Sequence, residues 1–227
     1  MKVASLFSGG KDSAFALWYA QMQGWDLVSL VTVVPESKDS WMFHFPAVKW
    51  TGLQAQAMGI PRTIIETMGV KEVEVDDLKS GLRRLIKSTG IGGIVSGAVA
   101  SEYQRSRLDN LCEELGVRSF APLWHKNQAE LVKEQIDCGF QIIITACSAL
   151  GLTSDWLGRT LNHENLDELV KLSRKHGLNV AFEGGEAETF VLAAPMFNGK
   201  LQVVRSHVNW SGDSGYLTLE EVLLKQD

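Results

Sequence analysis

The sequence predicts an α/β protein in which a doubly wound parallel sheet is followed by a smaller α+β domain. Up to Trp124, apolar strand-like segments alternate with helix-like segments, an order that requires parallel strands joined by right-handed crossovers. After Trp124 this alternation stops. A chain of 227 residues is long enough for one large domain or two small ones. We therefore expect domains at 1–124 and 125–227, with a soft boundary because no proline-rich or serine-rich linker separates them.

The expected strands of the first domain are short segments of consecutive apolar residues. Such runs are typical of strands that a parallel sheet buries on both faces. Pro35 marks the end of the second segment, because proline cannot donate to a sheet. The fourth segment leads into Gly97 and would lie beside the first, where the strand order of a doubly wound sheet reverses. The five segments are 3–7, 27–34, 62–68, 94–96 and 118–123.

The expected helices of the first domain show apolar residues at helical spacing and end at glycines. The clearest is 76–88, in which Leu78, Leu82 and Leu85 share one face and Gly90 follows. The others are 13–23, 47–58 and a segment that Gly116 closes.

The second domain is expected to contain two helices and at least three strands. Asn127 and Glu130 have the spacing of a capping arrangement at the start of a helix over 127–138. A second capped helix is expected over 165–176, closed by Gly177. The apolar segments 140–147, 201–208 and 215–219 predict strands.

The most informative stretch lies between the first strand and the first helix and reads Ser8, Gly9, Gly10, Lys11, Asp12 and Ser13. Two glycines permit a tight turn in which consecutive N–H groups face one oxyanion, and the helix start adds unpaired donors. The serines offer hydroxyls, Lys11 a positive charge, and Asp12 a carboxylate suited to magnesium. The stretch is too short for a Walker A loop. It predicts an anion site, and the alternative is an ordinary glycine turn with solvated charges.

A second group of candidates follows the fourth strand. Gly97 would allow close approach of an adenine or a ribose to the backbone. Arg105 and Arg107 lie near a helix start beside the proposed phosphate site, where guanidinium groups suit phosphate oxygens. Two solvated surface arginines are the alternative. Tyr103, in the same segment, is a candidate for the substrate side.

A third group contains Glu183, Glu186 and Glu188, which lie beside two glycines and between apolar flanks. If the chain is extended there, Glu186 and Glu188 project from the same face. Two such carboxylates can hold a cation, orient ammonia or act as general bases. An ordinary exposed hairpin is the alternative. His44, in the aromatic loop 36–46, either shapes a substrate site or packs among its aromatic neighbours, and packing is the commoner role.

Net charge, cysteine pattern and the length of apolar runs indicate which binding partners and which cellular compartment to expect. The formal charge of −5 argues against a nucleic-acid binder that depends on broad phosphate neutralisation. Cys112, Cys138 and Cys147 form no C-x-x-C pair, which favours small core residues in a reducing cytoplasm. No apolar run approaches the roughly 18 residues of a membrane span. Because 9–12 interrupts the first apolar segment, no signal peptide is expected either.

Taken together, these segments resemble the diphthine–ammonia ligase family of the PP-loop (N-type) ATP pyrophosphatases, which cleave ATP between the α and β phosphates. The matching pieces are SGGKDS at 8–13, SWMFHFP at 40–46, SGAVASEYQRSRLDNLCEELGV at 96–117, APLW at 121–124 and EGGEAET at 183–189. They extend over nearly the whole chain. One departure is Ala187, where the family often has an aromatic residue between the glutamates. This departure removes a stacking contact and leaves both carboxylates.

The resemblance implies an adenine nucleotide α-hydrolase-like fold and an AMP-forming amide ligase that uses ATP and Mg²⁺. Diphthine on a translation elongation factor would become diphthamide through an acyl-adenylate, with free ammonium as the nitrogen source. In this scheme the 8–13 turn holds pyrophosphate, with Lys11 neutralising charge and Asp12 placing Mg²⁺. Nucleotide contacts would come from Gly97, Arg105 and Arg107. The substrate side would hold Glu183, Glu186, Glu188, His44 and Tyr103.

Two alternatives stay open at the level of the sequence. A tRNA-modifying PP-loop enzyme would share the turn, but it calls for a basic face and a reactive cysteine pair, and neither is visible. A nucleotide-binding module that senses ATP without turnover would leave the 183–189 carboxylates without a function. The sequence does not set the oligomeric state, so a homo-oligomer also stays open, and it does not identify the surface that docks the elongation factor.

Overall fold

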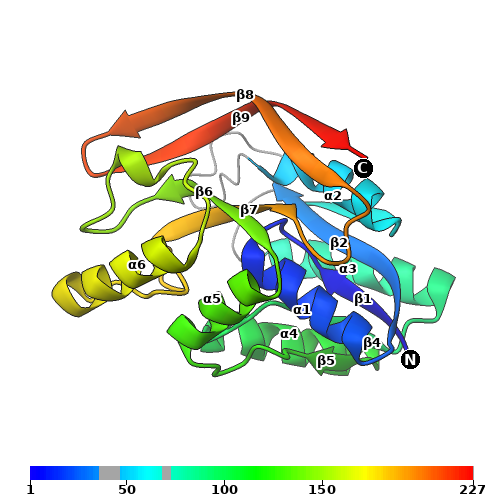
Figure 1. The fold of residues 1–227 in the computed structure, drawn as a ribbon. Coiled ribbons are helices and arrows are strands. Elements are labelled where there is room, and N and C mark those ends of the chain that lie inside the picture. The colour runs from blue at the N-terminus through cyan, green and yellow to red at the C-terminus, as the bar shows by residue number, and fades with distance from the viewer. Residues whose placement is uncertain (36–46, 68–72, 227) are drawn as a thin grey trace.

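The computed structural model describes residues 1–35, 47–67 and 73–226, and Figure 1 shows their arrangement. The strands are β1 (Lys2–Leu6), β2 (Asp26–Pro35), β3 (Arg62–Thr67), β4 (Gly93–Val95), β5 (Arg118–Phe120), β6 (Gln141–Cys147), β7 (Ala187–Ala193), β8 (Lys200–Ser211) and β9 (Ser214–Lys225). The α-helices are α1 (Lys11–Met22), α2 (Thr51–Met58), α3 (Val73–Thr89), α4 (Glu102–Leu115), α5 (Gln128–Asp137) and α6 (His163–His176). Short 3₁₀ helices are η1 (Val48–Trp50) and η2 (Ser154–Trp156).

The first sheet confirms the predicted doubly wound α/β fold. Within the described residues it contains five parallel strands in the order β3-β2-β1-β4-β5. Strand β4 lies beside β1, with Val3 opposite Gly93, as the sequence predicted. The strand order therefore reverses between β1 and β4, so the turn that follows β1 and the segment that follows β4 meet at one edge of the sheet.

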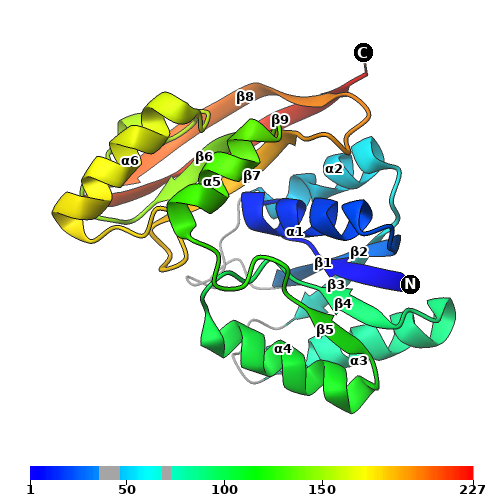
Figure 2. The same ribbon diagram turned by 60° about the horizontal axis from the view of Figure 1, so that its bottom comes forward.

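Both faces of this sheet are covered by helices, as Figure 2 shows. Val3 packs in a hydrophobic cluster with residues of α1 and α2, whereas the next residue, Ala4, packs in a second cluster with residues of α3 and α4. Both side chains are fully buried. Burial on both faces explains why β1 reads as a run of apolar residues without polar alternation.

The second sheet is antiparallel, with strand order β7-β6-β9-β8 among the described residues. Strands β8 and β9 form a long hairpin, and β9 pairs with β6 at Ala146–Tyr216 and Cys147–Gly215. Helices α5 and α6 belong to this half of the chain and contact each other. A separate sheet with its own helices confirms the predicted α+β character of the second half.

The two sheets share one hydrophobic core. The larger cluster joins Phe15 of α1 and Ala55 of α2 to Phe190 of β7 and Leu219 of β9. Helices α1 and α2 therefore lie between the two sheets. A domain boundary at residue 124 stays a prediction, because the strands divide there while the core does not.

Several element boundaries differ from the expected ones, and those around the candidate site have local reasons. Helix α1 begins at Lys11 because Gly10, with extended backbone at φ −80° and ψ 168°, is its N-cap. Strand β5 ends at Phe120, and a turn follows in which the Trp124 N–H donates to the Ala121 carbonyl. Strand β7 begins at Ala187, so Glu186 lies in the preceding turn. The aromatic loop with His44 lies outside the described residues.

The cysteines of the chain are free thiols, and Cys112 and Cys147 are buried, as small core residues should be. Burial raises the pKa of the Cys112 thiol to about 11 and that of Cys147 to about 12. Among the described residues, no helix is long and apolar enough to cross a membrane.

Candidate active site

The turn between β1 and α1 has the geometry of an anion site. Gly9 has left-handed backbone, with φ of +85°, a conformation that favours glycine. The Ser8 and Ser13 hydroxyl oxygens lie 3.1 Å apart, and the Gly10 N–H donates to Ser8 Oγ at 3.4 Å. The backbone N–H groups of Gly9, Asp12 and Ser13 donate to no group among the described residues. Open donors at the positive end of a helix are suited to phosphate oxygens.

Strand β7 of the second sheet supports this turn through hydrogen bonds to its backbone. The Val191 N–H donates to the Gly9 carbonyl at 3.0 Å, and the Lys11 N–H donates to Thr189 Oγ1 at 3.1 Å. The fully buried Gln54 donates from Nε2 to the Gly9 carbonyl at 3.0 Å and to the Val191 carbonyl at 2.8 Å. The shape of the turn therefore depends on strand β7 as well as on its own glycines.

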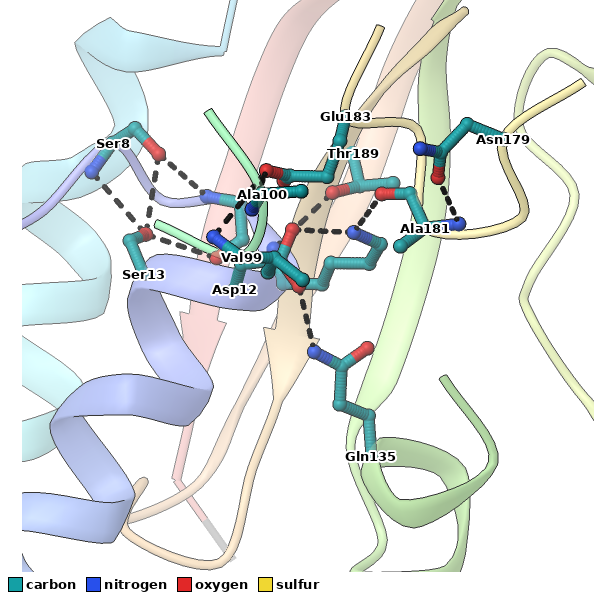
Figure 3. A network of polar contacts seen from close by, with 12 residues as sticks. Ser8, Asp12, Ser13, Val99, Ala100, Gln135, Asn179, Ala181, Glu183 and Thr189 are labelled. Carbon is teal, nitrogen blue, oxygen red and sulfur yellow. Dashed lines mark hydrogen bonds and ion pairs between the residues drawn. The ribbon is translucent and has the colours of Figure 1, made fainter. Parts of the chain in front are cut away.

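The Lys11 side chain contacts the segment that precedes β7, in which Figure 3 labels Ala181. Its side chain is 2% exposed, and Nζ donates to the Ala181 carbonyl at 2.6 Å and to the Asp12 carboxylate. The Phe182 ring centre lies 5.6 Å from Nζ. Phe182 itself has left-handed backbone, with φ of 64°, which is rare for a bulky residue and occurs in turns and at functional sites.

Two carboxylates on which the charge of Lys11 acts, those of Glu183 and Glu188, are largely withdrawn from water. Glu183 accepts from the Val99 and Ala100 N–H groups at 3.3 and 3.1 Å, which joins the segment after β4 to the one before β7. Burial, together with the negative charge of Asp12, raises the pKa of Glu183. Burial also raises the pKa of Glu188 to about 7, against the opposing charge of Lys11. Among the described residues, no hydrogen bond ends on the Glu188 carboxylate.

Glu186 lies just before β7, outside the strand that carries Glu188, so the extended chain that the sequence expectation assumed begins only at Ala187. Its carboxylate accepts from the Asn179 N–H at 3.1 Å and from the Gly184 N–H at 2.8 Å. The backbone is turned at 183–186 rather than extended, and this turn is what the carboxylate stabilises. A chemical role for Glu186 stays a prediction, while its structural role is clear from these contacts.

Gly97 follows β4, as the sequence predicted, but the structure gives a different reason for a glycine at this position. A Cβ at this position would lie 2.6 Å from the Ser13 nitrogen and 2.7 Å from the Asp12 carbonyl carbon. Glycine is therefore required because the segment after β4 packs directly on the first turn of α1. A contact of Gly97 with a nucleoside stays a prediction.

The two arginines of α4 contact aromatic rings. The Arg105 guanidinium lies 4.7 Å from the Trp124 ring centre, and its Nε donates to Asp109 at 3.3 Å. The Arg107 guanidinium lies 4.0 Å from the ring centre of Tyr103. A phosphate role for either arginine, and a substrate role for Tyr103, stay predictions. The candidate His44 lies outside the described residues.

Two residues that sequence reasoning did not single out, Gln54 and Gln135, donate into the site. Gln135 Nε2 of α5 donates to Asp12 Oδ1 at 2.9 Å. Gln135 lies on the buried face that Leu131 and Val132 define, so a polar residue on an apolar helix face was the available signal. Gln54 gives the same signal on α2.

The fold and this turn together define an α/β protein with a PP-loop at the carboxyl end of its first strand, next to the point where the strand order reverses. The chain belongs to the diphthamide synthase family, whose N-terminal domain matches residues 1–119 and whose C-terminal domain matches residues 127–224. This membership confirms the resemblance that the sequence segments indicated.

Named relatives agree with the family. Human diphthine–ammonia ligase is 36% identical over 92% of this chain and 85% of its own length. The mouse protein of the same name is 36% identical over 100% of this chain and 93% of its own. A solved structure from Methanocaldococcus jannaschii, described as a predicted subunit of tRNA methyltransferase, superposes with a TM-score of 0.49 at 18% identity. It covers 86% of this chain and 98% of that one.

Proposed function

We propose that this protein is an AMP-forming diphthine–ammonia ligase of the cytoplasm. It would convert diphthine on a translation elongation factor to diphthamide, with ATP and ammonium as the other substrates. The observation that supports this most is that the unpaired N–H donors at 8–13 belong to the same turn as Lys11 and Asp12, whose charges act on the largely buried carboxylates Glu183 and Glu188. An ATP sensor would need the donors, but it would have no use for Glu188, whose carboxylate accepts no hydrogen bond among the described residues.

In the first half of the reaction, the PP-loop would bind and stabilise the leaving pyrophosphate. The substrate carboxylate attacks the α-phosphorus of ATP, which gives an acyl-adenylate and releases pyrophosphate. The open N–H groups of the turn and the positive end of α1 would hold the leaving pyrophosphate. Lys11 would balance the developing charge, and its hydrogen bond to Asp12 keeps the two groups together.

The residues present fit a magnesium ion. Mg²⁺ is usually held by one or two carboxylates together with substrate phosphates, and the Asp12 carboxylate, 18% exposed, lies at the start of α1 beside the open donors. Asp12 would hold the ion. When bound, Mg²⁺ neutralises charge on phosphate oxygens.

The second half of the reaction belongs to the carboxylates. Ammonium must lose a proton before its nitrogen can attack the acyl carbon and displace AMP. With a pKa of about 7, Glu188 is suited to take that proton near neutral pH. Glu183 would keep the 97–100 segment in place beside the reacting groups. Glu186 would support the same turn through its backbone contacts.

The proposed function is tested by incubating the protein with ATP, magnesium, ammonium and the diphthine-bearing factor. We expect AMP in proportion to factor consumed, and a factor mass that fits replacement of OH by NH₂. ATP binding without AMP would support the sensor instead, and modification of tRNA in place of the factor would support the tRNA enzyme.

A further inference from the structure

The Asp12 carboxylate is held from two directions. Lys11 Nζ donates to Oδ2, and Gln135 Nε2 donates to Oδ1 at 2.9 Å. Gln135 comes from α5, in the half of the chain that carries the second sheet, and Figure 3 shows it reaching Asp12 from the side opposite Glu183. The hydrogen bond from Gln135 to Asp12 therefore links α5 directly to the PP-loop.

Gln135 is poorly explained as a packing residue. It is fully buried on the face of α5 that Leu131 and Val132 fill with apolar groups. Its Oε1 has no hydrogen-bond partner among the residues that the structure describes. A buried amide oxygen without a partner is costly, and an apolar side chain would avoid that cost. What an apolar side chain could not supply is the N–H donor to Asp12, since a carboxylate only accepts.

We propose that Gln135 is a positioning residue that fixes the Asp12 carboxylate for magnesium–nucleotide binding. A carboxylate has about four lone-pair directions, so contacts with Lys11 and Gln135 leave others free. By holding Oδ1, Gln135 sets which of these directions face the phosphates. This inference rests on the proposed function, because it assumes that Asp12 holds Mg²⁺ with ATP.

The buried Gln54 provides a matched comparison. It is also fully buried and also donates into the turn, and within the described part of the chain its Oε1 likewise has no partner. Its contacts end on backbone carbonyls, however, and not on Asp12. Gln54 should therefore support the shape of the phosphate cradle with or without magnesium, whereas Gln135 should matter when magnesium is present.

The test measures binding of α,β-methylene-ATP by calorimetry, once with magnesium and once with EDTA. For Gln135→Met, which keeps the length of the side chain, we expect about tenfold weaker binding with magnesium and less than about twofold change in EDTA, the scale at which metal-ligand supports act. For Gln54→Met we expect weaker binding in both conditions. If Gln135→Met does not fold, Gln135→Asn retains the amide but is too short to reach Asp12, and should show the same selective loss.

Wild-type-like binding by the Gln135 variant in both conditions, or equal weakening in both, would overturn the positioning role and leave the proposed function standing. Absence of nucleotide binding by the wild-type protein would overturn both.

Discussion

Lys11 and Asp12 are neighbours in the chain, yet their side chains join three distant segments. Lys11 reaches Ala181 and Asp12 reaches Gln135, while the backbone of both belongs to the PP-loop helix. Motif reasoning found the pair because its residue types and spacing are local. It could not find the partners, because contacts across so many residues leave no trace in local spacing.

Loss of either charged group should slow the chemical step. For Lys11→Ala and for Asp12→Ala we expect a decrease of roughly two orders of magnitude or more in single-turnover AMP formation, the scale of losing one electrostatic stabiliser. Thermal unfolding of each variant checks that the fold is intact. AMP formation by both variants at near-wild-type rates would refute the assigned roles.

Glu188 should make the protein less stable as pH rises. Its folded-state pKa of about 7 lies above its ordinary value of 4.5, so the folded chain binds the proton more tightly than the unfolded chain. The free energy of unfolding should therefore fall between pH 4.5 and about 7 and stay lower above that. The groups that act on Glu188 are Lys11, Asp12 and Glu183.

The substitution Glu188→Gln removes the loss of stability that comes from ionising a buried carboxylate. We expect the variant to be more stable than wild type by about 2–3 kcal/mol near pH 8, and close to wild type near pH 4.5, in urea unfolding at both pH values. Glu186→Gln is the control, because its carboxylate accepts two backbone N–H groups and should give no gain at high pH. If Glu188→Gln and wild type were equally stable near pH 8, burial would not raise the pKa of Glu188 as described.

For the helices and strands, the sequence predicted correctly those features that depend only on residues close together in the chain. Strand β1 reads as buried on both faces, and Gly59, Gly116 and Gly177 end helices in the left-handed conformation as expected. Asn127 caps α5, its side chain accepting from the Glu130 N–H. The turn at Glu186 was missed because it is set by contacts with Asn179 and Gly184, which alternation of residues does not report.

The close packing of Gly97, just after β4, on the first turn of α1 can be tested by substitution. In Gly97→Ala the new Cβ would lie 2.6 Å from the Ser13 nitrogen, so the PP-loop helix or the strand end must shift. We expect a loss of about 1–3 kcal/mol in the free energy of unfolding, measured by urea titration, together with weaker ATP binding.

Gly92→Ala is the matched control, since a Cβ there meets nothing within 4 Å. It should change stability by less than about 1 kcal/mol. Equal effects of the two substitutions would show that the close approach at Gly97 is not what matters.

At the scale of the whole molecule, the position of α1 and α2 between two sheets explains why the two family domains form one core. Phe15 and Phe190 belong to different halves but to the same cluster. The fold class of each half was predictable from periodicity. How one half packs on the other was not, because that packing depends on contacts such as Gln54 with Val191.

A shared core should unfold as one unit. We expect a single calorimetric transition for the full chain, with tryptophan fluorescence and circular dichroism giving coincident urea curves. A separate 1–124 fragment should not bind ATP, because it lacks Thr189 and Val191, which brace the turn. Two resolved transitions, or a fragment that binds ATP as the full chain does, would show that the halves are independent.

We infer that the turn after β1 holds the two phosphates that ATP loses when AMP is formed. A crystal structure with α,β-methylene-ATP and magnesium tests it most directly. We predict that the β and γ phosphates accept from the N–H groups of Gly9, Asp12 and Ser13, with the ion on Asp12. Phosphates bound elsewhere on the protein, with this turn unchanged and its donors still open, would contradict the account.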